Sequence, residues 1–116
     1  MHLAERIANT LLAYGLSEKY LGFHYMVFIL SNYAHEDFLF HTMTEIYNEL
    51  ADEFGVSHKA IQKNLTYFVK KCFEEVRNAN FSNLFAHYDT NHLPSSKEFV
   101  TLFLAQKKEW MKKYQN

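Results

Sequence analysis

Apolar residues recur at intervals of three and four positions along most of the chain, which is the spacing of an amphipathic α-helix. The pattern predicts a first helix over about residues 3–15 and a second over about residues 18–34, with Ser17 as the N-terminal cap of the second. The second stretch is apolar on nearly every face, as expected of a helix surrounded by others. Helical sequence continues over about residues 38–54, with one or two breaks expected inside it. We therefore predict a central helix packed among other helices.

The second half of the chain shows further helical patterns separated by polar segments. They are a helix over about residues 57–76, a loop over residues 77–83, a short helical turn at Leu84-Phe85, and a last helix that carries Phe99, Leu102, Phe103 and Trp110. Ser95 and Glu98 have the spacing of a capping box, in which a serine at the cap is followed three residues later by a glutamate. We expect an all-α fold of five or six helices that forms one compact domain over residues 1–116.

The composition agrees with a single helical domain. A chain of 116 residues has the size of one domain, and 48% hydrophobic residues supply enough apolar material for a core. Three glycines and one proline are few for a fold built on tight hairpins. The single cysteine, Cys72, excludes an internal disulfide and a multi-cysteine zinc site, which favours a reducing, cytoplasmic setting. No segment resembles a signal peptide or a membrane span, so we expect no membrane partner.

The formal net charge of −1 conceals a division along the chain. Residues 1–53 carry two basic and eight acidic side chains, which gives −6, whereas residues 54–116 carry ten basic and five acidic side chains, which gives +5. An anionic partner is therefore expected to bind the second half.

The segment around Gly55 has the pattern of a helix-turn-helix motif spanning about residues 44–76. Ala51 is small where two helices cross closely, and Gly55 can adopt the positive φ that ends the first helix in a short turn. We expect Val56 to insert from the turn into the core, Ser57 to cap the second helix, and Ile61 to anchor that helix. Together these positions predict a fixed angle between the two helices.

The exposed face of the second helix carries the chemistry for contact with double-stranded DNA. In such motifs this helix enters the major groove, where lysine reaches phosphates or guanine, glutamine pairs with an adenine edge, and a capped helix start holds a phosphate. The predicted DNA-binding residues are Ser57, His58, Lys59, Gln62, Lys63, Thr66, Tyr67 and Lys70. The alternative from the residues alone is an ordinary solvated helix face beside a tight turn.

Several blocks of sequence resemble one known family in their order and spacing. They are Gly15-Leu16, Gly22-Phe23-x-Tyr25, Tyr47-x-x-Leu50-Ala51-x-x-Phe54, Leu84-Phe85 and Pro94-Ser95-Ser96-x-Glu98-Phe99-Val100. In these blocks the chain resembles the C-terminal DNA-binding effector domain of the master response regulator of sporulation in endospore-forming bacteria. The resemblance implies a six-helix domain with an internal helix-turn-helix, a tandem homodimer on DNA, contact with RNA polymerase, and a role in transcription regulation.

The chain departs from that family where base sequence is read. Gln62 stands where the family has glutamate, Lys63 and Thr66 where it has arginines, and Tyr67 where it has histidine. Lysine and threonine cannot reproduce the bidentate contact of arginine with guanine, so the family's operator is not expected to carry over. The alternative function is a helical protein-interaction or dimerisation module that has lost DNA binding and uses aromatic surface or the acidic segment 36–53.

The remaining candidate sites have weaker patterns. His35, Glu36, Asp37 and His41 cluster in sequence, but their spacing is poor for a helical metal site, so we expect no metal. No phosphate loop, nucleophile elbow or paired-carboxylate motif occurs, and we expect neither an enzyme nor a cofactor.

Two further expectations concern buried and terminal residues. His24 and Cys72 lie in apolar patterns and are expected in the core, with the thiol inert. The terminal lysines are expected on a solvated helix, with contact to phosphates or an acidic protein surface as the alternative; they are Lys107, Lys108, Lys112 and Lys113.

Overall fold

The computed structural model describes residues 2–35 and 38–112, the last three by their backbone alone, and it is all-helical. In these ranges the helices are α1 (Leu3–Ala13), α2 (Leu21–Tyr33), α3 (Met43–Phe54), α4 (His58–Glu75), α5 (Ala79–Leu84), α6 (Ser96–Ala105) and α7 (Lys107–Lys112), with a short 3₁₀ helix, η1 (Phe38–Phe40). The predicted all-α class is confirmed, but the described residues form seven α-helices instead of the expected five or six. The β pairing found in this part of the chain is one isolated bridge between Asp89 and His92.

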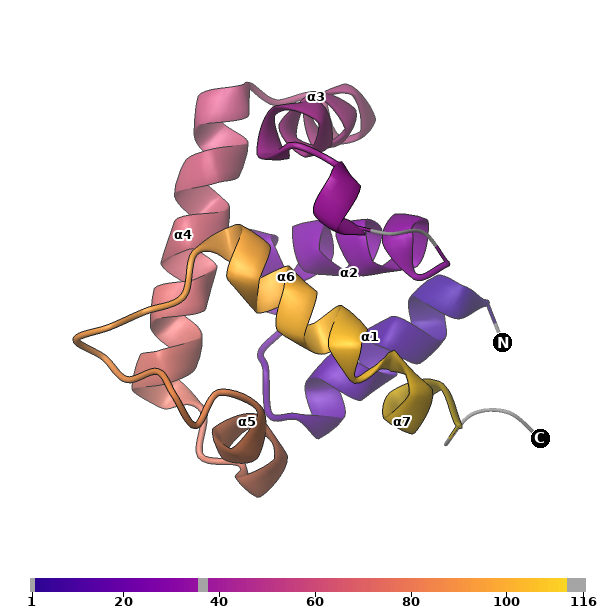
Figure 1. The fold of residues 1–116 in the computed structure, drawn as a ribbon. Coiled ribbons are helices and arrows are strands. Elements are labelled where there is room, and N and C mark those ends of the chain that lie inside the picture. The colour runs from indigo at the N-terminus through magenta and orange to yellow at the C-terminus, as the bar shows by residue number, and fades with distance from the viewer. Residues whose placement is uncertain (1, 36–37, 113–116) are drawn as a thin grey trace.

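Helix α2 lies at the centre, as its apolar sequence predicts, and packs against α1, α3, α4 and α6 (Figure 1). Its crossing with α4 is close because Gly22 has no side chain. A Cβ atom at Gly22 would lie 2.2 Å from Cβ of Phe68 and 2.9 Å from the carbonyl oxygen of Asn64. The absence of a side chain at one position thus sets the distance between the two main helices.

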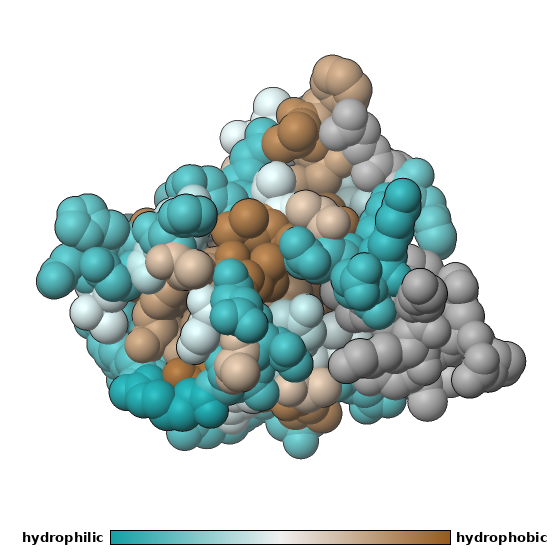
Figure 2. Space-filling model, turned by 60° about the horizontal axis from the view of Figure 1, so that its bottom comes forward, coloured by the Kyte–Doolittle hydropathy of each residue, from teal (hydrophilic) through white to brown (hydrophobic). Residues whose placement is uncertain are grey.

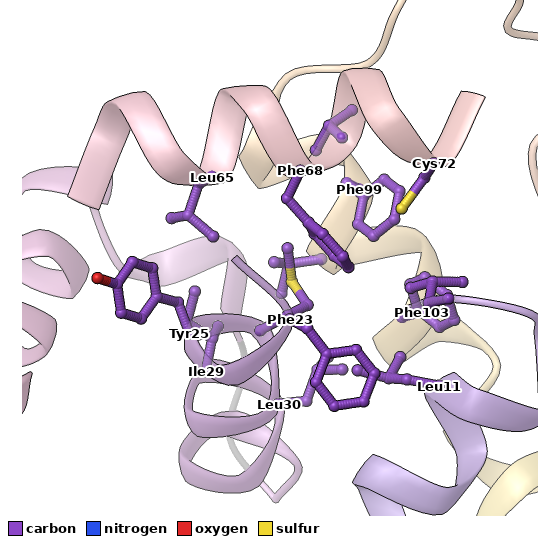
Figure 3. Close-up of a cluster of buried hydrophobic side chains, with 14 of the residues drawn as sticks. Leu11, Phe23, Tyr25, Ile29, Leu30, Leu65, Phe68, Cys72, Phe99 and Phe103 are labelled. Carbon is purple, nitrogen blue, oxygen red and sulfur yellow. The ribbon is translucent and has the colours of Figure 1, made fainter. Parts of the chain in front are cut away.

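The core is rich in phenylalanine, and each helix from α1 to α6 contributes buried residues to it. Figure 3 shows side chains of α4 directed towards α2 and α6, with α1 closing the far side. Phe85 stacks on Phe99 at a centroid distance of 4.6 Å, and Phe99 contacts Phe103 at 5.2 Å. Such aromatic pairs stabilise a core beyond the area they bury. The α4 residues that predict this packing, at helical spacing, are Ile61, Leu65, Phe68, Val69 and Cys72, and all are buried.

The predicted start of the second helix is wrong. The Ser17 hydroxyl accepts a bond from the amide of Lys19 within the connection, and α2 begins only at Leu21. Its cap residue, Tyr20, makes no side-chain cap bond. Ser17 thus stabilises a local turn instead of capping α2, because a serine side chain can bond nearby backbone in either arrangement.

The segment predicted as a loop over residues 77–83 is instead largely helix α5. Asn78 caps it by accepting bonds from the amides of Asn80 and Phe81, and its side-chain amide donates to the carbonyl oxygen of Ala13 in α1. Phe81 is buried and contacts Phe73 and Phe85, so the short helix is held by packing rather than by propensity. Leu84 and Phe85 consequently end this helix and do not begin one.

The chain between α2 and α3 is broken and fastened from α6 and α7. The break within residues 38–54 is confirmed, because η1 precedes α3 and Thr42 caps α3 through the amide of Glu45. Two lysines donate to backbone carbonyls of this region: Lys97 to His41 at 3.0 Å and Lys107 to Ala34 at 2.8 Å.

The predicted capping box of Ser95 and Glu98 is present at the start of α6. Among the described helices, none is long and apolar enough to cross a membrane.

Candidate functional site

Helices α3 and α4 are joined by a turn of three residues whose local chemistry is as the sequence predicts. Gly55 has φ of +66° and donates its amide to the carbonyl oxygen of Ala51 at 2.9 Å. The Ser57 hydroxyl accepts the amide of Ala60 at 3.1 Å. Leu50 and Ile61, one from each helix, are fully buried. These bonds and contacts hold α4 at a fixed angle to α3.

One predicted role in this turn is wrong. Val56 does not insert into the core, because 37% of its surface is exposed. The turn lies at the outer end of the helix pair, so the buried contacts that fix the angle come from Leu50 and Ile61 within the helices. Val56 is part of the surface that surrounds the start of α4.

All eight residues predicted to contact DNA are exposed: Ser57, His58, Lys59, Gln62, Lys63, Thr66, Tyr67 and Lys70. Figure 1 shows α4 along one side of the molecule, with α3 near its first turn. Lys59, Lys63 and Lys70 follow at intervals of four and seven residues and therefore share one face of the helix. Their Cα atoms span about 16 Å along its axis. We call these three side chains the lysine stripe.

The first turn of α4 carries a cation, Lys59, where a helix ordinarily favours anions. The amides of a helix N-terminus give it partial positive charge, which acidic residues in the first turn would balance. Here the first turn has no acidic residue and instead contains His58 and Lys59. This arrangement stabilises the helix less than an acidic turn would, and it leaves a concentration of positive charge suited to an anion.

The lysine stripe is largely unopposed by carboxylates. Lys59 and Lys63 form no ion pair with any residue that the structure describes, whereas Lys70 lies 3.9 Å from Glu74. Glu74 also pairs with Lys71 at 3.2 Å, which raises the pKa of that lysine. The positive charge is therefore greatest in the first half of α4 and falls towards its end.

Tyr67 lies beside the stripe within a cluster of aromatic and charged side chains. Tyr67 is 48% exposed, and its ring meets the ring of Tyr20 edge to face at 5.8 Å, while Nζ of Lys71 lies 5.4 Å from the Tyr67 ring centroid. Tyr20 donates its hydroxyl to Glu75, and this hydrogen bond raises the pKa of Tyr20 to about 12. Sequence reasoning missed Tyr20, because its partner lies in another helix.

The acidic end of α3 belongs to a different surface. Asp52, Glu53 and Glu49 line a shallow groove of about 640 Å³ together with Phe28 and Tyr33. The Tyr33 hydroxyl donates to Glu49 at 2.9 Å. The α3 carboxylates thus form no described ion pair with the lysine stripe.

Two other sequence expectations require correction. His24 is exposed rather than buried, and its Nε2 lies 2.9 Å from the carbonyl oxygen of Glu18. It faces outward from α2 towards the preceding turn. Lys107 is not a solvated terminal lysine, because it is half-buried and donates to Ala34. Lys108 is exposed, as expected.

The expected burial of Cys72 is confirmed, and burial raises the pKa of its thiol. No group of three metal-ligating side chains forms within the described residues. Glu36, Asp37 and Lys113 lie outside those residues, as do the side chains of Trp110 and Lys112.

An exposed apolar feature at η1 was not singled out from sequence. Phe40 is 84% exposed and Leu39 63% exposed. Leu39 also lines a groove of about 430 Å³ with Phe38 and Leu104. Figure 2 shows one face on which hydrophobic side chains reach the surface among hydrophilic ones, including on the projection at its top. Helical periodicity could not reveal this feature, because η1 is shorter than one full amphipathic repeat.

Comparisons with protein families, with curated proteins and with solved structures find no match for this chain.

Proposed function

We propose that this chain binds double-stranded DNA as the effector domain of a transcription regulator, with α3, its turn and α4 acting as a helix-turn-helix. Helix α4 enters the major groove by its first half. Lys59 and Lys63 bind phosphates or guanine acceptors, and Gln62 pairs with an adenine edge. The resemblance to the sporulation regulator family in the blocks around Tyr47 and Pro94 supports the same function.

The proposal depends mainly on the exposure of Lys59 and Lys63 and on their lack of ion pairs within the described residues. Both are exposed, lie on one helix face, and are unpaired within the described residues, next to a helix start that has no acidic residue. A lysine on an ordinary solvated helix is often opposed by a carboxylate three or four residues away, as Lys70 and Lys71 are opposed by Glu74. The first half of α4 instead keeps its positive charge available to a polyanion.

Salt dependence of binding to a random duplex tests the proposal. If the three lysines of the stripe each neutralise one phosphate, the logarithm of the association constant should fall with the logarithm of salt with a slope of about −2.7. Affinity should then drop about 40-fold between 50 and 200 mM salt. A protein with no duplex affinity at low salt would refute the proposal.

Paired lysine variants locate the binding surface. Lys63→Ala should make the slope shallower by about 1, because one phosphate contact is lost. Lys108→Ala is the matched control, since it removes the same charge from an exposed position in α7 and should leave the slope unchanged. Equal effects of the two substitutions would mean that net charge, and not α4, drives binding.

A second function, self-association, is favoured by the exposed residues of η1. A two-fold symmetric interface uses the same self-complementary patch on both copies, and a projection beside a hollow is one form of such a patch. Phe40 projects beside a groove that its neighbours Phe38 and Leu39 line. Burying one phenylalanine is worth about 1.5–3 kcal/mol, and symmetry doubles the gain.

Sedimentation analysis of the wild type and of Phe40→Ser tests this second function. The wild type should dimerise with rising concentration, and Phe40→Ser should remain monomeric with an unchanged helical circular dichroism spectrum. Leu21→Ser is the matched control, because Leu21 is another strongly exposed apolar residue and lies away from η1. A wild type that stays monomeric, or an equal loss of dimer in Phe40→Ser and Leu21→Ser, would contradict the proposal.

A further inference from the structure

Within the predicted DNA surface, the ring of Tyr67 contacts Tyr20, which is the N-terminal cap residue of α2. The two rings meet edge to face at 5.8 Å with an interplanar angle of 73°. Lys71 approaches the same ring to 5.4 Å. An exposed tyrosine normally samples several rotamers, but these neighbours on two sides restrict the ring of Tyr67.

Tyr20 is itself fixed from three directions. Its hydroxyl donates to both carboxylate oxygens of Glu75 at 2.6 and 2.8 Å. Its ring also contacts Phe68 at 6.2 Å, and Nζ of Lys19 lies 5.1 Å from its centroid. The support under Tyr67 is thus connected to the core and to the last turn of α4.

The helical position of Tyr67 lies at the edge of the lysine stripe. Tyr67 follows Lys63 by four residues, so it lies one turn further along and slightly to the side. Beyond it, Lys71 and Lys19 are paired with Glu74 and Glu75. Tyr67 therefore stands where the unopposed positive charge ends, and its hydroxyl is a neutral donor suited to a phosphate that flanks the groove.

We infer that Tyr67 donates its hydroxyl to a phosphate of the duplex backbone and that Tyr20 is a positioning residue that holds the Tyr67 ring for this contact. The inference rests on the proposed function and adds a residue outside the helix-turn-helix to it. Because the ring is ordered before binding, less side-chain entropy is lost on association. The contact is to the backbone, so it strengthens binding to every sequence alike.

A double-mutant cycle on a random duplex tests the inference. Tyr67→Phe should weaken binding about 2- to 10-fold, the effect of one hydrogen bond, without changing the salt slope, since no charge is removed. Tyr20→Leu should weaken binding by a similar factor in the wild type and have no effect when Tyr67→Phe is already present. Tyr20→Phe keeps the ring contact and should recover most of the affinity lost in Tyr20→Leu.

Control measurements separate positioning from folding and from base reading. Tyr88→Phe removes another tyrosine–glutamate hydrogen bond, 2.8 Å from Tyr88 to Glu98, and should leave duplex affinity unchanged. Additive effects of Tyr20→Leu and Tyr67→Phe would overturn the positioning role. A Tyr67→Phe protein that selects different bases from a random library would overturn the phosphate contact. Absence of duplex binding by the wild type would refute the proposed function and this inference together. If the wild type binds, the Tyr67 and Tyr20 variants test this inference separately from the proposed function.

Discussion

Gly22 and Gly55 are required in this fold for different physical reasons. At Gly22 the reason is space, because a Cβ would lie 2.2 Å from Cβ of Phe68 where α2 crosses α4. At Gly55 the reason is backbone conformation, because φ is +66° while no atom lies within 4 Å of the Cβ position. A helical Gly22 and a turn Gly55 therefore respond differently to the same substitution.

Gly22→Ala should lower the free energy of unfolding by about 3 kcal/mol or more, since overpacking moves two helices apart. Gly55→Ala should cost about 1–2 kcal/mol, which is the price of a left-handed conformation with a Cβ. Urea unfolding of both variants measures the difference. If Gly22→Ala lowered the free energy of unfolding no more than Gly55→Ala, the close crossing of α2 and α4 at Gly22 would be contradicted.

The two glycines also show what sequence can reveal about single residues. The role of Gly55 was predictable, because the residues that need its positive φ are its immediate neighbours. The steric constraint on Gly22 comes from Phe68 in another helix, and no local pattern reports it. The same holds for Tyr20, whose partners Glu75 and Tyr67 lie in α4.

At the scale of elements, strongly periodic helices were predicted well and short ones were not. The bounds of α1 and α4 agree closely with the periodicity, and the capping box at α6 is present. Helix α5 was predicted as a loop because six residues are too few to show a period, and its sequence is polar. What stabilises α5 is its cap and the burial of Phe81, which depend on α1 and on the core.

Asn78 both caps α5 and fastens it to α1, and two substitutions separate these roles. Asn78→Ala should lower the free energy of unfolding by about 1–2 kcal/mol and speed amide exchange in α5, because the cap is lost. Asn78→Asp keeps the acceptor for the amides of Asn80 and Phe81 but cannot donate to Ala13. It should therefore lower the free energy of unfolding by less than Asn78→Ala does. Equal losses in the two variants would show that the cap contributes little.

At the scale of the whole molecule, the division of charge along the sequence becomes a division in space only in part. The lysine stripe is exposed, as the helical pattern predicts, and the carboxylates of α3 line a separate groove. Other basic residues of the second half do not add to the surface charge as expected. Lys97 and Lys107 fasten the α2–α3 connection, and Lys71 is paired with Glu74. Pairing depends on tertiary contacts, so sequence could assign the candidate face but not its strength.

Backbone amide shifts, followed during titration with a random duplex at low salt, would show directly whether DNA binds through α4. We predict that the largest shifts fall between Ser57 and Lys70, around the turn and the exposed face of α4, with small shifts in α5 to α7. Raising the salt concentration should reverse them together. Shifts centred on another surface, or none at duplex excess, would contradict DNA binding through α4.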